Sequence, residues 1–351
     1  MLCTFTGIPT SSQTAHSKPP PFLRRILHRY TPMMHAGHFA SSAAFRDLNF
    51  STCAADRPLI AQFCATEPMT LLAAARLVRD RCDAVDLNLG CPQHNARSGG
   101  YGAYLMDDLP RVHDLISVLT APPGLGVPVT AKIRIFDEKA PFARTVAYAR
   151  MLQDAGCAML AVHGRTRDQR DCNAHRANWA AIAAVRAAVD IPVLANGDIR
   201  SVDEAEACMA ATGCAGVLSA EPLLWAPDLF SDTPRDSRPF EWPALLALEY
   251  CALARQYATP PRIVFSHAHK LLGRWLADKE FRDLRPCLSA NSIEPEQTLD
   301  IVEAVGAAMR DRLRAMAAAG CARQPEADRE WTMAARGARR TAEGQGRRSD
   351  I

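Results

Sequence analysis

The sequence lacks three features that would assign it to common protein classes. Every Ala-rich stretch is interrupted by Arg, Asp or Glu, so that no run approaches the roughly eighteen apolar residues of a membrane-spanning helix. The twelve cysteines show no C-x-x-C spacing, and Cys208 and Cys214 have no second pair of ligands for zinc. No G-x-G-x-x-G fingerprint of a Rossmann-type dinucleotide site occurs. We expect a soluble, metal-free protein with reduced thiols, outside the membrane and inside the cell.

Acidic residues are missing from the first 29 positions, which are rich in Ser, Thr and Pro and end in the basic stretch 24–29. This composition is typical of a transit peptide or a disordered leader. Because the next segment already has the pattern of a buried strand, we predict a low-complexity, disordered leader over residues 1–29. We expect a cytoplasmic location, with nuclear or organellar locations left open.

The formal charge of +3 hides a concentration of arginines near the C-terminus. They are Arg310, Arg312, Arg314, Arg323, Arg329, Arg336, Arg339, Arg340, Arg347 and Arg348. A basic tail beside a near-neutral body suits a polyanionic partner such as RNA, because binding releases counterions. A solvated tail without a partner is the alternative.

From residue 30 onward, short apolar runs alternate with longer segments of helical periodicity, as in repeated β-α units around a parallel sheet. The apolar runs are 30–34, 59–63, 84–89, 127–133, 158–163, 192–195 and 216–219. The helical segments between them are 69–79, 110–119, 145–154, 179–189 and 202–211. We predict Asn178 and Ser201 as helix N-caps, and Gly156 and Gly213 as helix ends.

This pattern predicts an α/β fold, a TIM (β/α)8 barrel over residues 30–235 that lacks its first βα unit. We count about seven strands where such a barrel needs about eight. A linker at 232–241 then leads into a helical domain at 240–318, with helical spacing in 242–257, 262–278 and 296–318. The tail at 319–351 is expected to be basic and disordered.

Polar residues follow the apolar runs where each predicted strand ends. They are Gln62, the stretch 88–91, Lys132 and Arg134, the stretch 163–165, the stretch 196–198 and the stretch 219–221. Singly, each has a structural explanation: Gln62 could cap a turn, Lys132 could reach solvent, and His163 could be a core histidine. Together they favour a cofactor, because barrels of this type carry function at the carboxyl ends of their strands.

FMN is the simplest cofactor for these groups. Gln62, Lys132 and His163 offer hydrogen-bond donors to the carbonyl and N1 edge of an isoalloxazine, where reduced flavin is negatively charged. Gly197 and the small residues at 219–220 would let backbone N–H groups approach a phosphate after the last two strands.

Cys91 is the candidate chemical acid. Gly90 and Pro92 bend the chain on either side of it, at a strand end. A thiol with an ordinary pKa of about 8.5 is mostly protonated at neutral pH and can donate a proton to a carbanion-like centre. The alternative, a buried structural cysteine, is the expected state of the other cysteines.

Several segments resemble the signature of tRNA-dihydrouridine synthases, most closely the eukaryotic branch that modifies positions 16 and 17. They are residues 57–64, 85–93, 99–105, 131–136, 162–167, 195–200, 217–221 and 269–272. The resemblance covers residues 30 to about 315.

The resemblance implies that Cys91 donates a proton to C5 of a uracil while hydride passes from N5 of reduced FMN to C6, with NADPH as reductant. It implies a uridine flipped out of the tRNA D-loop as substrate. The implied contacts to the flavin ring and ribityl chain are Gln62, Lys132 and His163. Those around the phosphate end are Asn196, Gly197, Asp198, Ala220 and Glu221. The implied substrate contacts are Arg134, Lys270 and Arg274, although the last two could simply solvate a helix face.

Two departures from the family pattern leave alternatives open. No Ala-Pro-Met turn precedes residue 30, and although residues 2–6 could form a strand, the Pro-rich sequence after them offers no crossover helix. Pro222 also occupies a position that is usually glycine. The alternatives are an inactive tRNA-binding homologue and an FMN barrel acting on a small pyrimidine. We expect a monomer in either case.

Overall fold

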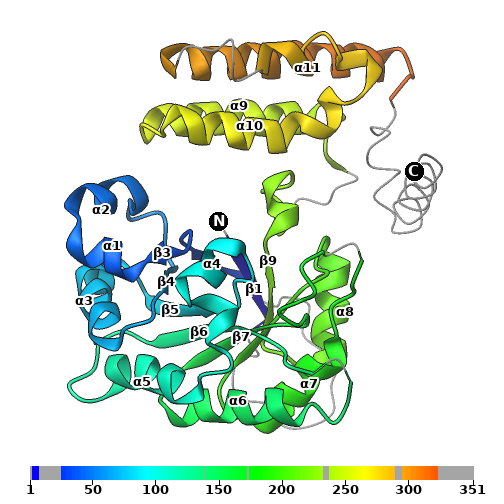
Figure 1. Ribbon diagram of the computed structural model, residues 1–351. Helices are drawn as coiled ribbons and strands as arrows, with labels where there is room; N and C mark the ends of the chain where they lie inside the picture. The colour runs from blue at the N-terminus through cyan, green and yellow to red at the C-terminus, as the bar shows by residue number, and fades with distance from the viewer. Residues whose placement is uncertain are drawn as a thin grey trace, which may run out of the picture. The chain divides into compact units, whose positions relative to one another are not determined.

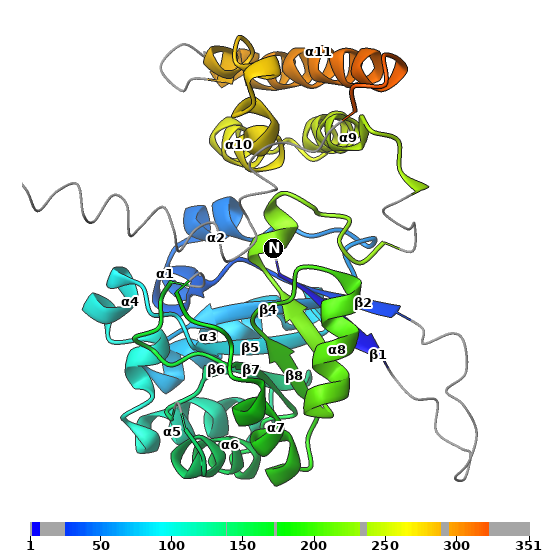
Figure 2. The ribbon, with the colours of Figure 1, turned by 90° about the vertical axis from the view of Figure 1, so that its right-hand side faces the viewer.

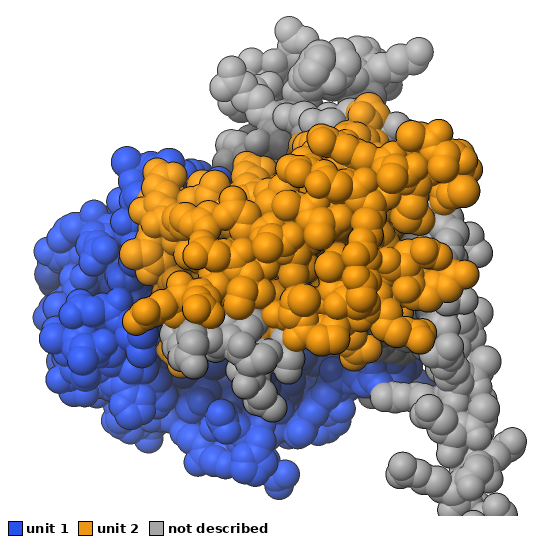
Figure 3. Space-filling model, turned by 90° about the horizontal axis from the view of Figure 1, so that it is seen from above, with its two compact units in different colours: residues 1–220 blue, residues 221–351 orange. Residues whose placement is uncertain are grey.

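The computed structural model describes residues 2–7, 25–137, 139–171, 174–231, 237–288 and 295–322. The chain divides into two compact units, Met1–Ala220 and Glu221–Ile351 (Figure 3). The division precedes the predicted linker, and the predicted tail lies outside the described residues beyond position 322. Within the described ranges, no helix is long and apolar enough to cross a membrane.

Six consecutive parallel strands form most of the sheet in the first unit. They are β4 (Leu59–Cys64), β5 (Ala84–Leu89), β6 (Val129–Arg134), β7 (Met159–His163), β8 (Val193–Asn196) and β9 (Gly216–Ser219). Each agrees with an apolar run of the sequence to within about two residues. Every residue of β4 and β5 is buried, as expected for strands that are covered on both faces.

The N-terminal residues complete the ring. β1 (Leu2–Gly7) pairs antiparallel with both β9 and β2 (Arg25–Tyr30), and β2 pairs parallel with β4 (Figure 2). The two-residue strand β3 (Met34–His35) continues along β4. The ring therefore closes through eight strands, in the order β1-β2-β4-β5-β6-β7-β8-β9.

The barrel prediction is confirmed, and within the segment predicted as a leader, residues 2–7 and 25–29 lie in strands. The place of the first βα unit is taken by an antiparallel strand. The physical reason is that a sheet edge presents unpaired N–H and C=O groups, and a short extended segment can satisfy them without a crossover helix. Residues 8–24 lie outside the described part of the chain.

Helices connect the parallel strands and lie outside the ring (Figure 1). They are α3 (Pro68–Val78), α5 (Leu109–Thr120), α6 (Ala143–Asp154), α7 (Trp179–Ala188) and α8 (Val202–Thr212). The predicted caps are confirmed, since the side chains of Asn178 and Ser201 accept backbone N–H groups of α7 and α8. Gly213 ends α8 with a φ of 66°, and Gly156 follows α6 with a φ of 97°.

Three short helices were not predicted. They are α1 (Ala36–Ser41), α2 (Ala43–Asn49) and α4 (His94–Gly99). Each is too short for a clear helical period, and α1 and α2 depend on capping by the side chains of His35 and Ser42. Single 3-10 turns lie at Arg79–Arg81, Gly102–Leu105, Glu221–Leu224, Lys279–Phe281, Arg285–Leu288 and Pro295–Gln297.

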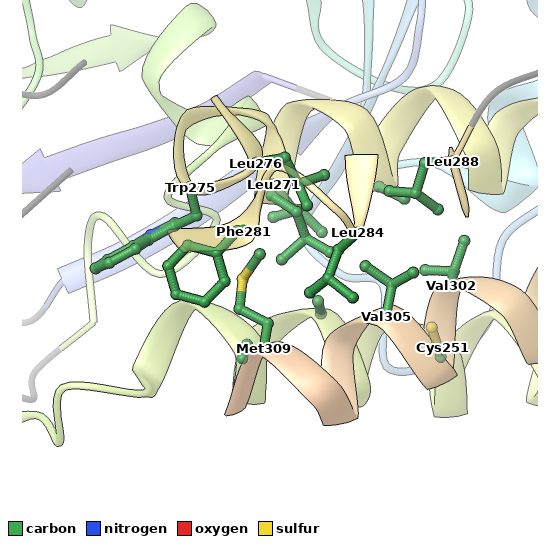
Figure 4. Close-up of a cluster of buried hydrophobic side chains, with 14 of the residues drawn as sticks. Cys251, Leu271, Trp275, Leu276, Phe281, Leu284, Leu288, Val302, Val305 and Met309 are labelled. Atoms are coloured by element: carbon green, nitrogen blue, oxygen red, sulfur yellow. The ribbon is translucent and has the colours of Figure 1, made fainter. Parts of the chain in front are cut away.

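The second unit contains α9 (Trp242–Gln256), α10 (Pro261–Leu276) and α11 (Thr298–Ala318), which correspond to the three helical segments of the sequence. Its core brings together Leu276, Phe281, Val305 and Met309, with Trp275 at the edge of the cluster (Figure 4). The Phe281 ring lies edge-on to the indole of Trp275, with ring centroids 6.0 Å apart. Burying each such side chain stabilises the unit by roughly 1.5–3 kcal/mol.

Candidate active site

Cys91 lies on a tight turn that two hydrogen-bond systems hold from opposite sides. The Asn88 side-chain oxygen accepts the backbone N–H groups of Gly90 at 3.1 Å and Cys91 at 2.9 Å. The Ala103 N–H donates to the Cys91 carbonyl at 3.0 Å. Gly102 makes this approach possible, because a Cβ there would lie 2.8 Å from the Cys91 oxygen and its φ is 65°. The half-buried thiol therefore sits on a fixed backbone at the end of β5.

A buried polar chain supports this turn from inside the barrel. Asn88 Nδ2 donates to Gln62 Oε1 at 2.9 Å, and Gln62 Nε2 donates to Asp86 Oδ2 at 2.9 Å. The Thr130 hydroxyl donates to the other Asp86 oxygen at 2.6 Å. Burial raises the pKa of Asp86 to about 6, and the bonds from Thr130 and Gln62 oppose this shift. Sequence reasoning found Gln62 but missed Asp86.

Lys132 is held beside this chain without a fixed partner. It pairs in register with Asn88 across β5 and β6 and is half-buried. Within the described part of the chain its ammonium forms no hydrogen bond or ion pair. Burial and the neighbouring Arg134 lower the pKa of Lys132 to about 8, although Asp86 and Cys91 raise it. An anionic ligand would relieve this cost, so the group fits the negative edge of a reduced flavin.

Arg134, which was predicted to bind substrate, connects two loops of the barrel rim. Its Nε donates to the Gly90 carbonyl at 2.7 Å, and its Nη1 donates to the carbonyl oxygens of Thr166 at 2.8 Å and Gln169 at 3.2 Å. Burial and the nearby Arg165 lower the pKa of Arg134 to about 10. At least part of its guanidinium therefore stabilises the turn that carries Cys91.

His163 is held as a neutral imidazole. Its Nε2 lies 3.0 Å from Nη1 of Arg165, and since arginine only donates, Nε2 accepts. Burial and the charges of Lys132, Arg134 and Arg165 lower the pKa of His163 well below its usual value. The remaining ring nitrogen, Nδ1, then carries the hydrogen and is a donor.

Three arginine side chains of the first unit lie close to the Asp198 carboxylate. This carboxylate pairs with Arg165 and lies 3.9 Å from Arg176 and 3.7 Å from Arg200. It also accepts the Ala177 N–H at 2.7 Å, with a backbone φ of 61°. The predicted cofactor contact Asp198 therefore orders arginines that can themselves face a phosphate. Sequence reasoning missed Arg176 and Arg200, although Arg200 follows closely in the same motif.

The other predicted phosphate-end residues lie after the last two strands. Asn196 Nδ2 donates to the Leu218 carbonyl at 2.7 Å and so joins β8 to β9. Gly197 has a φ of 115°, and a Cβ there would lie 2.6 Å from the Cβ of Ala177. Ala220 ends the first unit and Glu221 begins the second.

The structure thus brings most predicted site residues of the first unit to the carboxyl-terminal parts of neighbouring strands, from Gln62 within β4 to Asn196 at the end of β8. Hydrogen bonds connect Gln62 to the Cys91 turn, and Arg134 to the same turn. No group of three or more side chains suited to a metal ion occurs among the described residues.

In the second unit, the charged side chains differ in whether they are paired with acids, stacked on an aromatic ring or exposed. Arg312 and Arg314 on α11 form ion pairs with Asp283 and Glu241. The guanidinium of Arg274 stacks on the Trp225 ring, 3.6 Å from its centroid. Lys270 is exposed on α10 and forms no ion pair with any described residue.

Comparison with known proteins agrees with this site. The family model described as dihydrouridine synthase (Dus) matches residues 22–304. A Rattus norvegicus protein named tRNA-dihydrouridine(16/17) synthase (NAD(P)(+))-like is 47% identical over 244 residues, 69% of this chain and 53% of that protein. The Saccharomyces cerevisiae tRNA-dihydrouridine(16/17) synthase is 46% identical over 207 residues, 58% of this chain and 48% of that protein.

A Homo sapiens protein named as a tRNA-dihydrouridine(20a/20b) synthase-like protein is 33% identical over 267 residues, 75% of this chain and 80% of that protein. The chain spans about half the length of the rat and yeast relatives. Since the family model covers every strand except β1, together with the Cys91 turn and most of the helical unit, the chain belongs to the dihydrouridine synthase family.

Proposed function

We propose that this chain reduces uridine to 5,6-dihydrouridine in tRNA, with FMN as its resident cofactor and NADPH as the reductant. The observation that carries the proposal is the Cys91 turn, which holds a thiol beside Lys132 at the rim of a barrel. The names of the rat and yeast relatives favour positions 16 and 17 of the D-loop.

The groups at the rim fit FMN. Lys132 has a half-buried ammonium without a partner in the described chain, and His163 and Gln62 have N–H donors beside it. Arg176 and Arg200 supply positive charge where a phosphate would lie, near the left-handed backbone of Gly197. Bound FMN, once reduced, would supply the hydride that C6 of the uracil accepts.

The chain's own residues then act on the other carbon. Cys91 donates the thiol proton to C5, and a positioned proton donor typically contributes on the order of a hundredfold to ten-thousandfold in rate. Asn88 and Arg134 hold the peptide unit before this cysteine, and the Ala103 N–H holds its carbonyl, so that the sulfur stays in place while the proton moves. Fixed geometry of this kind lowers the entropic cost of the step.

Basic side chains of the second unit that form no ion pair with a described residue support RNA binding. Arg262 and Lys270 lie on α10, and Arg282 and Arg285 follow that helix. All four are exposed and form no ion pair among the described residues. They remain available to phosphates, whereas the paired Arg312 must give up Asp283 first. Extracting a base from folded tRNA requires such a grip.

A direct test combines cofactor analysis with product detection. The purified protein should be yellow, and with NADPH it should convert uridine to dihydrouridine in unmodified tRNA, measured by mass spectrometry of nucleosides. Cys91→Ala should lower the rate at least a hundredfold. Cys287→Ala, a matched change at an exposed cysteine of the second unit, should leave it unchanged. Equal rates for Cys91→Ala and wild type would contradict the proposal that Cys91 donates the proton.

The position of the product is a separate question. Mass spectrometry of D-loop fragments should place dihydrouridine at positions 16 and 17. Product at 20a or 20b instead would align the chain with its human relative and contradict the proposed specificity.

The direction of β1 favours a second candidate, a tRNA-binding protein without redox activity. Since Cys3 pairs with Ser219 at the end of β9, while Gly7 pairs with Arg25 at the start of β2, β1 ends at the rim opposite the site. The carboxyl end of β1 therefore does not lie at the rim that carries the site. Protein that shifts tRNA in a gel but carries and binds no flavin would support this candidate over the enzyme.

A further inference from the structure

The carboxylate of Asp86 lies inside the barrel below its rim. It contacts neither solvent nor the Cys91 turn directly. Asp86 on β5 has an exposed fraction of 0%. It accepts hydrogen bonds from Gln62 Nε2 at 2.9 Å and from the Thr130 hydroxyl at 2.6 Å. Burying a carboxylate is costly, so its position inside the barrel requires an explanation.

The hydrogen bonds above Asp86 run in one direction. An ionised carboxylate only accepts, so Gln62 must turn its NH2 group toward Asp86 and its oxygen toward Asn88. Asn88 must then present its NH2 group to Gln62 and its oxygen to the backbone of the turn. The backbone N–H groups at the other end only donate. Asp86 and the backbone N–H groups, at the two ends of this hydrogen-bond chain, therefore require the same orientation of the two amides.

This fixed orientation determines what the site offers to a ligand. Each amide NH2 group has two hydrogens, and one of each is used within the chain. Gln62 and Asn88 therefore each keep one N–H at the strand ends where a flavin or uracil would lie. If either amide turned over, a carbonyl oxygen would take that place.

We propose that Asp86 is a positioning residue of this site: acting through Gln62 and Asn88, it fixes the direction of both amides and thereby the backbone turn that carries Cys91. The inference deepens the proposed function, on which the identity of the ligands rests. The contacts to the turn itself are independent of any cofactor.

The surroundings of Asp86 keep its charge sensitive to pH. The charge of Lys132 on β6 lowers the pKa of Asp86, and Asp86 in turn raises the pKa of the Tyr30 phenol on β2 and of the Cys157 thiol before β7. Burial raises the pKa of Asp86 to about 6. Above that pH the carboxylate accepts from Gln62, and below it the acid gains an O–H donor, so that Asp86 no longer requires the Gln62 NH2 group to face it.

The rate of amide hydrogen exchange reports directly on the last bonds of this hydrogen-bond chain, because Asn88 accepts the Gly90 and Cys91 N–H groups. We would compare these amides in flavin-free wild type, Asp86→Asn and Asp86→Ala. Asp86→Ala should lose about tenfold or more in protection, since an unsatisfied buried amide is expensive. Asp86→Asn should stay within about threefold of wild type, because Asn can accept from Gln62 and donate to the Thr130 hydroxyl.

Two results would overturn the proposal. One is wild-type protection in folded Asp86→Ala; the other is an equal loss in Asp86→Asn, which would make charge and not direction the cause. Should Asp86→Ala fail to fold, Gln62→Met cuts the same chain while leaving Asp86 bonded to Thr130. It should show the same loss of protection, and wild-type protection in this variant would equally contradict the proposal.

A matched control and a second readout separate this inference from the proposed function. Asp278→Ala removes another buried aspartate, in the second unit, and should leave exchange at Gly90 and Cys91 unchanged. FMN affinity, measured by quenching of flavin fluorescence, should fall about tenfold or more in Asp86→Ala. If wild type binds no FMN, the proposed function fails while the exchange experiment still decides the role of Asp86.

Discussion

Changing Asp198 to Asn tests the charge arrangement at the phosphate end of the site. The substitution keeps the side-chain volume and removes one negative charge. Asp198 is 5% exposed and its principal partner, Arg165, is 4% exposed. Arg165 also contacts His163 and lies near Arg134, so it would be left as a buried cation among other donors.

The expected loss of folding stability is about 2–4 kcal/mol. Breaking a buried ion pair by removing one partner costs about 3–5 kcal/mol, because the other charge stays buried. Two features reduce this figure here. The Asn oxygen can still accept from Arg165, and Asn tolerates the backbone φ of 61° at position 198. The Ala177 N–H donates to the other carboxylate oxygen and would face the Asn NH2 group, so the loss of that bond limits the reduction.

Urea denaturation followed at Trp179 would measure this loss. Trp179 is the single tryptophan of residues 1–220, its indole donates to the Gly197 carbonyl at 3.3 Å, and 5-fluorotryptophan labelling gives it a separate resonance. Asp283→Asn is the control, since its ion pair with Arg312 is exposed and such pairs contribute little. A loss at Asp198 no larger than that of the control would refute the argument from burial.

Three further predictions follow from single contacts. Gly102→Ala should lower tRNA reduction and destabilise the barrel more than Gly126→Ala, because both have a positive φ but nothing lies within 4 Å of a Cβ at Gly126; equal unfolding energies would contradict this. The free energy of unfolding of wild type, relative to that of Lys132→Met, should rise between about pH 8 and 10. The reason is that the unfolded chain binds the lysine proton more tightly than the folded one, in which the pKa of Lys132 is about 8. A fall of this difference with pH would contradict the prediction. Lys270→Ala should weaken tRNA binding and reduce the slope of log K against log salt by about 0.7–0.9, measured by titration at several salt concentrations, whereas Arg312→Ala should change it less.

Strand positions were predictable because the central strands of a closed barrel are buried on both faces. Runs such as 84–89 and 216–219 are short, apolar and bounded by turn residues, so burial alone identifies them. The caps at Asn178 and Ser201 were predictable for a similar reason, since their chemistry is local.

The partners and direction of β1 were not predictable in the same way, although residues 2–6 were recognised as a possible strand. Its residues 2–7 are held by partners more than two hundred positions away in β9, and its direction is set by the ring that it closes. Nothing within a six-residue window carries that information. Asp86 illustrates the opposite failure, because its position lay inside a correctly predicted strand while the reason for its polarity went unnoticed.

That reason is the two-residue period of a strand. A buried cluster contains Ile60, Ala84, Ala161, Leu194 and Leu218, one from each of five strands, so these side chains point into the barrel. Side chains two residues further along point the same way, about 7 Å nearer the carboxyl ends.

Adding two to those positions gives four polar groups of the site, Gln62, Asp86, His163 and Asn196, and Ala220 after β9. Adding two again on β5 gives Asn88. An apolar layer closed below a polar one explains how a carboxylate such as Asp86 can be wholly buried and still direct a functional turn. Because the period is a property of the strand itself, counting in twos along an apolar run separates the residues that face the helices from those that face the ligand.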